Sequence, residues 1–273
     1  MSLGNATRSE LAKQFTTSMW WILAIVLVGY VGSTAAALAG VFGAVSSGAL
    51  SGDDVTGEPI AGEILAPVIY SLATAVGYVF PLLIGTLLVT GEFRHQTLTP
   101  TFLAAPRRGV ALGGKIAAGV VMGILYAVVA LASAIAPGAG LLAVFGIDAQ
   151  LTSSDTWAMI GRIVIAFVLW ALVGIGIGAL VRNQVAAVVG VIAFTQFIEP
   201  ILRTVGAFVE GIAAVTRYLP GAASDDLVGA SIFSSLAGSA ESLEWWAGGL
   251  VLLGYATVLL VLGYLVSWRR DVS

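Results

Sequence analysis

Six long apolar stretches with very few charged residues restrict the fold more than any other feature of this chain. A helix needs about 20 apolar residues to cross the ~30 Å hydrocarbon core of a bilayer. With 59% apolar and only 10% charged residues, the chain could not cover a water-exposed surface. We therefore expect a single all-α, polytopic membrane domain over residues 1–273. Its six transmembrane helices are expected at about residues 20–46, 66–90, 109–136, 157–181, 184–203 and 245–268.

The uneven distribution of charge between the connecting segments predicts the orientation of the spans. Lys and Arg near span ends resist translocation, so the face that holds most of them lies in the cytoplasm. Six spans place nine basic residues on the same membrane face as both termini: Arg8, Lys13, Arg94, Arg107, Arg108, Lys115, Arg182, Arg269 and Arg270. The opposite face receives Arg162, Arg203, Arg217 and all of the acidic residues except Glu10, Glu92 and Asp271. We expect a multi-pass protein of the plasma membrane with both termini in the cytoplasm.

The cytoplasmic loop at residues 91–108, between the second and third spans, is compact and basic. Its residues Thr97 to Leu103 can form a short helix that ends before Pro106. Phe102 and Leu103 are large apolar side chains on a segment that otherwise faces water. Such side chains commonly fill pockets on a partner protein. The alternative is that they dip into the lipid headgroup region.

The residue pattern of this loop resembles that of the ATP-binding-cassette export permeases of the drug- and antibiotic-export class. The pattern G-E-x-R-x-x-T-L-x-x-x-F-L-x-x-P-x-R, followed by a Lys, is matched by Gly91, Glu92, Arg94, Thr97, Leu98, Phe102, Leu103, Pro106, Arg108 and Lys115. The family usually has a Gly before the Thr, where this chain has Gln96. Elsewhere SELAKQ, GALVRNQVAA, LPGAA and the final RRD are similar to phrases of actinobacterial members, so the resemblance covers nearly the whole chain.

The resemblance implies the membrane subunit of an ATP-driven exporter that moves a small hydrophobic or amphipathic, drug-like compound out of the cell by alternating access. In the family, this loop includes a coupling helix that sits on the ATPase subunit. The residues to which the resemblance then gives a coupling role are Glu92, Arg94, Thr97, Phe102, Leu103 and Arg108. Glu92 and Arg94 would orient the helix or pair with charges of the partner. Two permease copies, expected as a homodimer, would work with two ATPase subunits, which would bind the ATP and Mg.

Nothing in the sequence indicates catalysis, a cofactor, a metal site or nucleic-acid binding on this chain. There is no cysteine, and His95 is the only histidine, which argues against thiolate sites and triads. The run from Gly109 to Lys115 fits a phosphate-binding loop, but Ile116 stands where a Ser or Thr would bind magnesium. Three alternating glycines at Gly174, Gly176 and Gly178 lie in the fourth span and indicate close helix packing.

The N-terminal residues 1–19 precede the first span, and two interpretations are open. Leu11, Phe15 and Met19 recur at four-residue spacing, which is typical of an amphipathic helix on the membrane surface. Alternatively, these residues are simply the hydrated first turns of the first span. Thr7 and Glu10 have the spacing of a capping box, which predicts a helix start at Thr7.

The later spans contain irregularities. Pro81 predicts a kink in the second span, and Pro137 predicts the end of the third span near residue 136. Residues 204–244 are too polar and too broken by Pro220 for an ordinary span, so we expect outer re-entrant or interfacial helices there.

The fifth span is short, since the first acidic residue after Arg182 is Glu199. At 1.5 Å per residue this length leaves Glu199 within the outer leaflet. One hypothesis is a structural ion pair between Glu199 and Arg203, four residues apart. The other is a functional intramembrane polar site of Gln196, Glu199 and Arg203. The second hypothesis would also fit an ion- or proton-coupled secondary transporter. A membrane enzyme is a poorer fit, because the spans lack the paired Glu, His or Asp residues that such an enzyme needs.

Overall fold

The computed structural model describes residues 2–48, 62–97, 108–230 and 243–268, and within these ranges it contains helices and no strands. The first half of the chain forms α1 (Leu3–Thr16), α2 (Met19–Ser46), α3 (Gly62–Ala75), α4 (Val79–Arg94) and α6 (Arg108–Val144). The second half forms α7 (Ser154–Leu180), α8 (Gln184–Ala193), η1 (Phe194–Ile198), α9 (Glu199–Phe208), α10 (Glu210–Thr216), α11 (Pro220–Val228), α13 (Trp245–Gly263) and η2 (Tyr264–Trp268). η1 and η2 are single π-helical turns.

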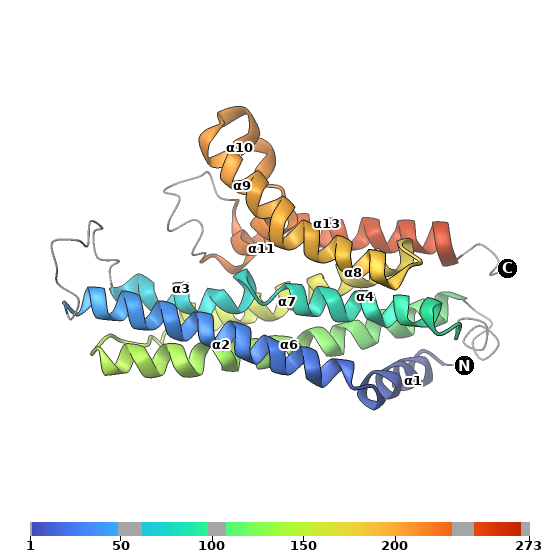
Figure 1. The fold of residues 1–273 in the computed structure, drawn as a ribbon, viewed down its shortest axis with the longest axis horizontal. Helices are drawn as coiled ribbons and strands as arrows, with labels where there is room; N and C mark the ends of the chain where they lie inside the picture. The colour runs from blue at the N-terminus through green and yellow to red at the C-terminus, as the bar shows by residue number, and fades with distance from the viewer. Residues whose placement is uncertain (1, 49–61, 98–107, 231–242, 269–273) are drawn as a thin grey trace.

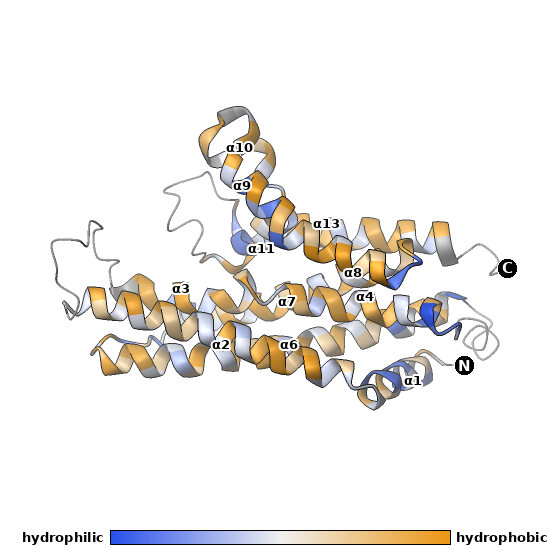
Figure 2. Ribbon diagram, viewed as in Figure 1, coloured by the Kyte–Doolittle hydropathy of each residue, from blue (hydrophilic) through white to orange (hydrophobic). Residues whose placement is uncertain are grey.

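Six helical segments are long and apolar enough to cross a membrane, which confirms the predicted all-helical, six-span architecture. They are Met19–Ser46, Ile64–Arg94, Arg108–Val144, Ser154–Leu180, Gln184–Gly206 and Trp245–Val266. The long helices run side by side along the long axis of the molecule, and α1 and the last turns of α13 lie at the same end (Figure 1). Hydrophobic residues cover most of these helices, whereas hydrophilic residues gather on α1, at the adjoining end of α4, and where α9 meets α11 (Figure 2).

The core of the bundle is the second span packed against α7. Gly174 and Gly85 lie where the backbones of α7 and α4 touch, because a Cβ on Gly174 would collide with the Leu82 carbonyl and one on Gly85 with the Ala171 carbonyl. Gly176 faces the other way, where a Cβ would lie 2.6 Å from the Cβ of Leu259 in α13. The alternating glycines therefore allow α7 to contact a helix on each side, as their spacing predicted.

The predicted end of the third span is wrong, because α6 continues through Pro137 to Val144. Gly138 packs against α3, where a Cβ would lie 2.7 Å from Ile69 Cγ2, and Leu142 is fully buried. Packing of this last part of α6 against α3 keeps the helix intact despite the proline.

The N-terminal segment is a helix of its own. α1 ends at Thr16 and α2 begins at Met19, so the segment is not the first turns of the first span. The predicted capping box is wrong. The Ser2 hydroxyl, not that of Thr7, caps the helix by accepting from the Asn5 N–H at 3.3 Å, and Glu10 lies mid-helix with its side chain used elsewhere.

The second and fifth spans are each interrupted next to a proline. In the second span, Phe80 N–H donates to the Gly77 carbonyl, to which Pro81 cannot donate, and the helix breaks between α3 and α4. In the fifth span, Glu199 N–H reaches back five residues to the Phe194 carbonyl, which forms the π-helical turn η1 before Pro200. The kink predicted at Pro81 is thus a full break, whereas the interruption at Pro200 was not predicted.

Candidate functional site

Four charged side chains from three helices form a closed ion network at the end of the bundle that carries α1. Lys13 Nζ lies 2.7 Å from Glu10 Oε1 and 2.8 Å from Glu92 Oε1. Lys115 Nζ lies 2.7 Å from Glu10 Oε2 and 3.0 Å from Glu92 Oε2. Each lysine therefore bridges the same two carboxylates, and the four charges balance. We call these four residues the ion network.

The ion network is largely shielded from solvent. The side chain of Lys115 is fully buried, and those of Glu10 and Glu92 are only 7% and 6% exposed. Lys115 also donates to the Leu88 carbonyl at 3.3 Å. A charge buried this deeply is tolerated only when it is paired and hydrogen-bonded. The network therefore fixes the relative positions of α1, α4 and α6.

The local sequence explains how α1 reaches Lys115. Gly114 forms the contact surface for α1, because a Cβ there would lie 2.8 Å from the Cβ of Ala6. One turn further along α1, Glu10 is directed at Lys115, and Lys13 lies three residues on along the same helix. The Gly and Lys that imitate a phosphate-binding loop thus have a packing and charge-pairing role.

Lys13 is the member of the network nearest to solvent, with 43% of its side chain exposed. Burial alone would lower the pKa of its ammonium group. Hydrogen bonds to Glu10 and Glu92 outweigh that effect and raise the pKa above its ordinary value. Lys13 therefore stays charged at neutral pH and closes the network from outside.

The predicted coupling residues fall at both ends of the loop. Glu92 is buried and contacts lysines of its own chain, so its carboxylate faces the interior rather than a partner. Arg94 ends α4 and is exposed, as is Thr97, whereas Arg108 begins α6. Phe102 and Leu103 lie outside the described residues.

α4 ends in a Schellman motif, in which the last carbonyls of the helix accept from residues beyond it. Thr97 N–H donates to the Glu92 carbonyl at 3.0 Å, and Gln96 N–H to the Phe93 carbonyl at 3.4 Å. This motif requires a left-handed residue at its turn, usually a glycine. Gln96 occupies that position with φ of 53°. The one departure from the loop pattern thus falls where a glycine would be favoured.

A second polar cluster joins the fifth span to α11, at the far side of the core from the ion network. Glu199 is 1% exposed, and its Oε1 accepts from Gly221 N–H at 2.6 Å and Ala222 N–H at 3.3 Å. These amides are the second and third of α11, so Glu199 supplies the capping oxygen that Leu219 at the N-cap position lacks. A side chain at Gly221 would displace this carboxylate, because a Cβ there would lie 2.6 Å from Glu199 Oε1.

Glu199 and Arg203 do not pair with each other as one hypothesis expected. Arg203 instead lies 2.7 Å from Asp225 of α11, so two successive turns of the fifth span each contact a different part of α11. Gln196 of η1 is exposed. Within the described part of the chain, no side-chain hydrogen bond or salt bridge joins the three residues of the predicted intramembrane site, which stays a prediction.

Tyr78 stabilises the interruption in the fifth span. In the five-residue register of η1, Pro200 stands where an N–H would donate to the Thr195 carbonyl. The Tyr78 hydroxyl donates to that carbonyl instead, at 3.1 Å, from the break before α4. The ring of Tyr78 packs 4.5 Å from that of Trp170, whose Nε1 donates to Ser224 of α11.

Sequence reasoning missed the roles of Glu10, Lys13, Tyr78 and Asp225, although it placed Lys115 in the loop pattern. Glu10 and Lys13 have an intrahelical spacing that any solvated helix surface shows. The one available signal was that these charged residues, Glu92 and Lys115 each lie next to a long uncharged segment. This placement could have suggested that the ends of three helices meet.

Comparison with known proteins gives no assignment: neither a protein-family model nor a curated protein sequence matches the chain.

Proposed function

We propose that this chain is the membrane-spanning permease subunit of an ATP-driven exporter, and that the ion network is the rigid base of its coupling loop. The observation that supports this proposal most strongly is that Glu92, at the start of the loop, and Lys115 of α6, beyond its end, are joined in two ways. They pair directly at 3.0 Å, and they are also linked through the Lys13–Glu10 pair. A force applied to the segment between them would reach α4, α6 and α1 together.

In this proposal the loop docks on a separate ATPase subunit that binds ATP and Mg. Two copies of the permease, facing the cytoplasm with both termini, work with two ATPase subunits. Residues 98–107 provide the contact, with Phe102 and Leu103 as anchors. The outer helices α9, α10 and α11 close the opposite end, and the cargo is a small hydrophobic or amphipathic compound.

The test uses co-expression with an ATPase encoded beside this chain's gene, followed by purification through a tag on the permease. The double substitution Phe102→Ala, Leu103→Ala should release the ATPase while the permease stays inserted and dimeric. The matched control is Phe208→Ala, Val209→Ala, which truncates two exposed apolar side chains at the far end of the bundle. Full retention of the ATPase and of ATP-driven transport by the loop variant would refute the docking role.

A second candidate function is ion- or proton-coupled transport through Glu199. The observation in its favour is that Glu199 Oε2 is buried with no hydrogen-bond partner among the described residues, whereas Oε1 caps α11. Transport driven by a pH gradient in vesicles without any ATPase, and abolished by Glu199→Gln, would support this function. ATP-dependent transport that Glu199→Gln leaves intact supports the exporter.

A further inference from the structure

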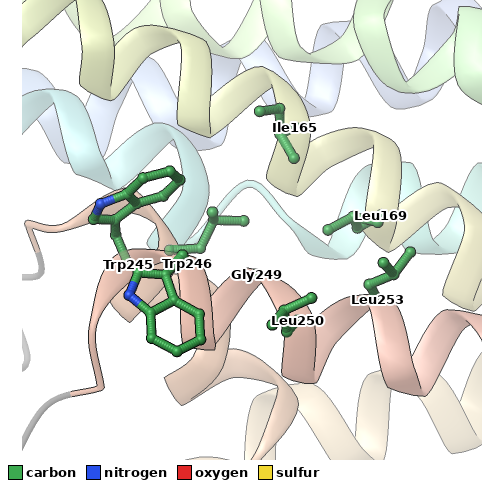
Figure 3. Close-up of a pocket in the computed structure, with 8 residues that line it drawn as sticks. Ile165, Leu169, Trp245, Trp246, Gly249, Leu250 and Leu253 are labelled. Carbon is green, nitrogen blue, oxygen red and sulfur yellow. The ribbon is translucent and has the colours of Figure 1, made fainter.

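An apolar groove lies on the outer surface of the bundle where α7, α11 and α13 meet. It has a volume of about 360 Å³ and is lined by side chains of all three helices, among them Ile165, Leu227, Trp245 and Leu250 (Figure 3). Gly249 leaves the space open, because a Cβ there would already lie 3.1 Å from Leu227 Cδ1. The groove therefore exists because α13 has no side chain at this position.

The groove opens away from the protein rather than into its core. Ile165, Trp245 and Leu250 are each at least half exposed, although they belong to helices apolar enough to cross a membrane. Two adjacent tryptophans, Trp245 and Trp246, begin the sixth span, and tryptophan is enriched at the level of the lipid headgroups. The groove thus starts at the membrane interface and extends along α13 toward Leu253, into the depth of hydrocarbon.

The side chain of Arg162 lies at the end of the groove that begins with Trp245. The guanidinium carbon of Arg162 lies 5.6 Å from the centre of the Trp245 ring, and one of its nitrogens donates to the Val228 carbonyl at 3.2 Å. Within the described part of the chain, Arg162 forms no salt bridge with a carboxylate. A guanidinium has five N–H donors arranged in a fork that fits a phosphate group. Among the described residues, the Val228 carbonyl is the one hydrogen-bond acceptor that these donors contact.

We propose that the groove binds one phospholipid, with an acyl chain between α7 and α13 and the phosphate on Arg162. This inference does not depend on the exporter function. A second copy of the chain is a poorer occupant, because a two-fold contact centred on the groove would bring two Arg162 side chains together. A phospholipid supplies both the apolar chain and the negative charge that the site lacks.

The experiment measures phospholipid retention and thermal stability of the delipidated protein in mild detergent. The probes are dioleoyl phosphatidylglycerol, dioleoylglycerol as the same chains without phosphate, and glycerol phosphate as the headgroup without chains. Only the phosphatidylglycerol should remain bound in native mass spectra and raise the unfolding temperature at low micromolar concentration. We expect Arg162→Gln to weaken its binding about tenfold, as loss of a charged hydrogen bond does, and Gly249→Leu to abolish it.

The chain offers matched controls for both variants. Gly254→Leu adds the same side chain to an exposed face of α13 with open space around it, and Arg182→Gln removes an exposed cation at the other end of α7. Both should bind like the unaltered protein. If Gly249→Leu does not fold, Leu253→Trp is used in its place, because a tryptophan at this position fills the groove from its exposed side.

Three results would each overturn the proposal. Dioleoylglycerol that binds as tightly as phosphatidylglycerol would remove the role of Arg162. Equal binding to the groove variants and to their controls would show that lipid attaches elsewhere. A change from dimer to monomer in Gly249→Leu, without any change in lipid retention, would assign the groove to a second copy.

Discussion

Lys115 is the residue of the ion network that most needs its partners, since it is the only fully buried member and contacts both carboxylates. Replacing it by methionine keeps most of the length of the side chain, but it leaves Lys13 as the one cation of the network that pairs with Glu10 and Glu92. Removal of one partner from a buried ion pair costs about 3–5 kcal/mol, mostly because the other charge is left unpaired.

We therefore expect Lys115→Met to lower the free energy of unfolding by about that amount, measured by denaturant titration in detergent micelles. Adding Glu92→Gln should recover part of the loss, because the two residues interact directly. The comparison is Lys13→Met, which should lose less, because the side chain of Lys13 is 43% exposed and that of Lys115 is fully buried. A double variant that loses the sum of the two single effects would show that Lys115 and Glu92 are not coupled.

Gln96 has an unfavourable left-handed backbone for a residue with a side chain, with φ of 53° at the end of α4. A glycine there avoids the steric cost that a side chain meets in the left-handed region, about 1 kcal/mol. Gln96→Gly should therefore raise the midpoint of thermal unfolding, whereas Gln96→Val should lower it. The same pair of substitutions at Gln14, inside α1, serves as control and should show glycine as destabilising. A lower midpoint for Gln96→Gly would contradict the role of the motif.

At the scale of elements, the two proline-linked interruptions are held together by one hydrogen bond. Pro81 and Pro200 interrupt neighbouring spans, and Tyr78 from one interruption satisfies the Thr195 carbonyl in the other. Both partners are buried, so the bond is protected from water. The hydrogen bond of Tyr78 and those of Glu199 together link the second span to the fifth span and the fifth span to α11.

Tyr78→Phe should destabilise the protein by about 1–3 kcal/mol, because it leaves the Thr195 carbonyl without a donor while the packing on Trp170 is retained. Faster amide hydrogen exchange confined to residues 194–200 would locate the effect at η1. Tyr30→Phe is the control, since that ring packs against Phe80 in the same region but is 43% exposed. Equal effects of the two substitutions would show that the hydroxyl of Tyr78 has no special role.

The sequence predicted the six spans because hydropathy and length are properties of each segment alone. The same local reasoning failed at Pro137, where burial of Gly138 against α3 decides that the helix continues. One of the two hypotheses for the fifth span also paired Glu199 with Arg203, since both lie on one helix, whereas in the structure α11 supplies hydrogen-bond partners to each. Contacts between segments distant in the chain, such as Glu10 with Lys115, depend on packing that no local pattern records.

At the scale of the whole molecule, the ion network, α1 and η2 lie at one end of the bundle, and α11 with its polar contacts lies toward the other (Figure 1). Basic residues dominate the first end, so the positive-inside rule predicts that this end faces the cytoplasm. The absence of cysteine from the natural sequence makes this orientation directly measurable.

Single cysteines at two exposed positions, His95→Cys beside the ion network and Thr152→Cys before α7, should react differently with a membrane-impermeant maleimide. In intact cells Thr152→Cys should be labelled and His95→Cys should not, because the reagent cannot cross the bilayer to the end that holds the basic residues. After permeabilisation both should react, which shows that each thiol is accessible. Labelling of His95→Cys from outside would show that the protein has the opposite orientation. The loop between α4 and α6 could then not contact a cytoplasmic ATPase. The orientation therefore decides whether the network can act as the base of a coupling loop at all.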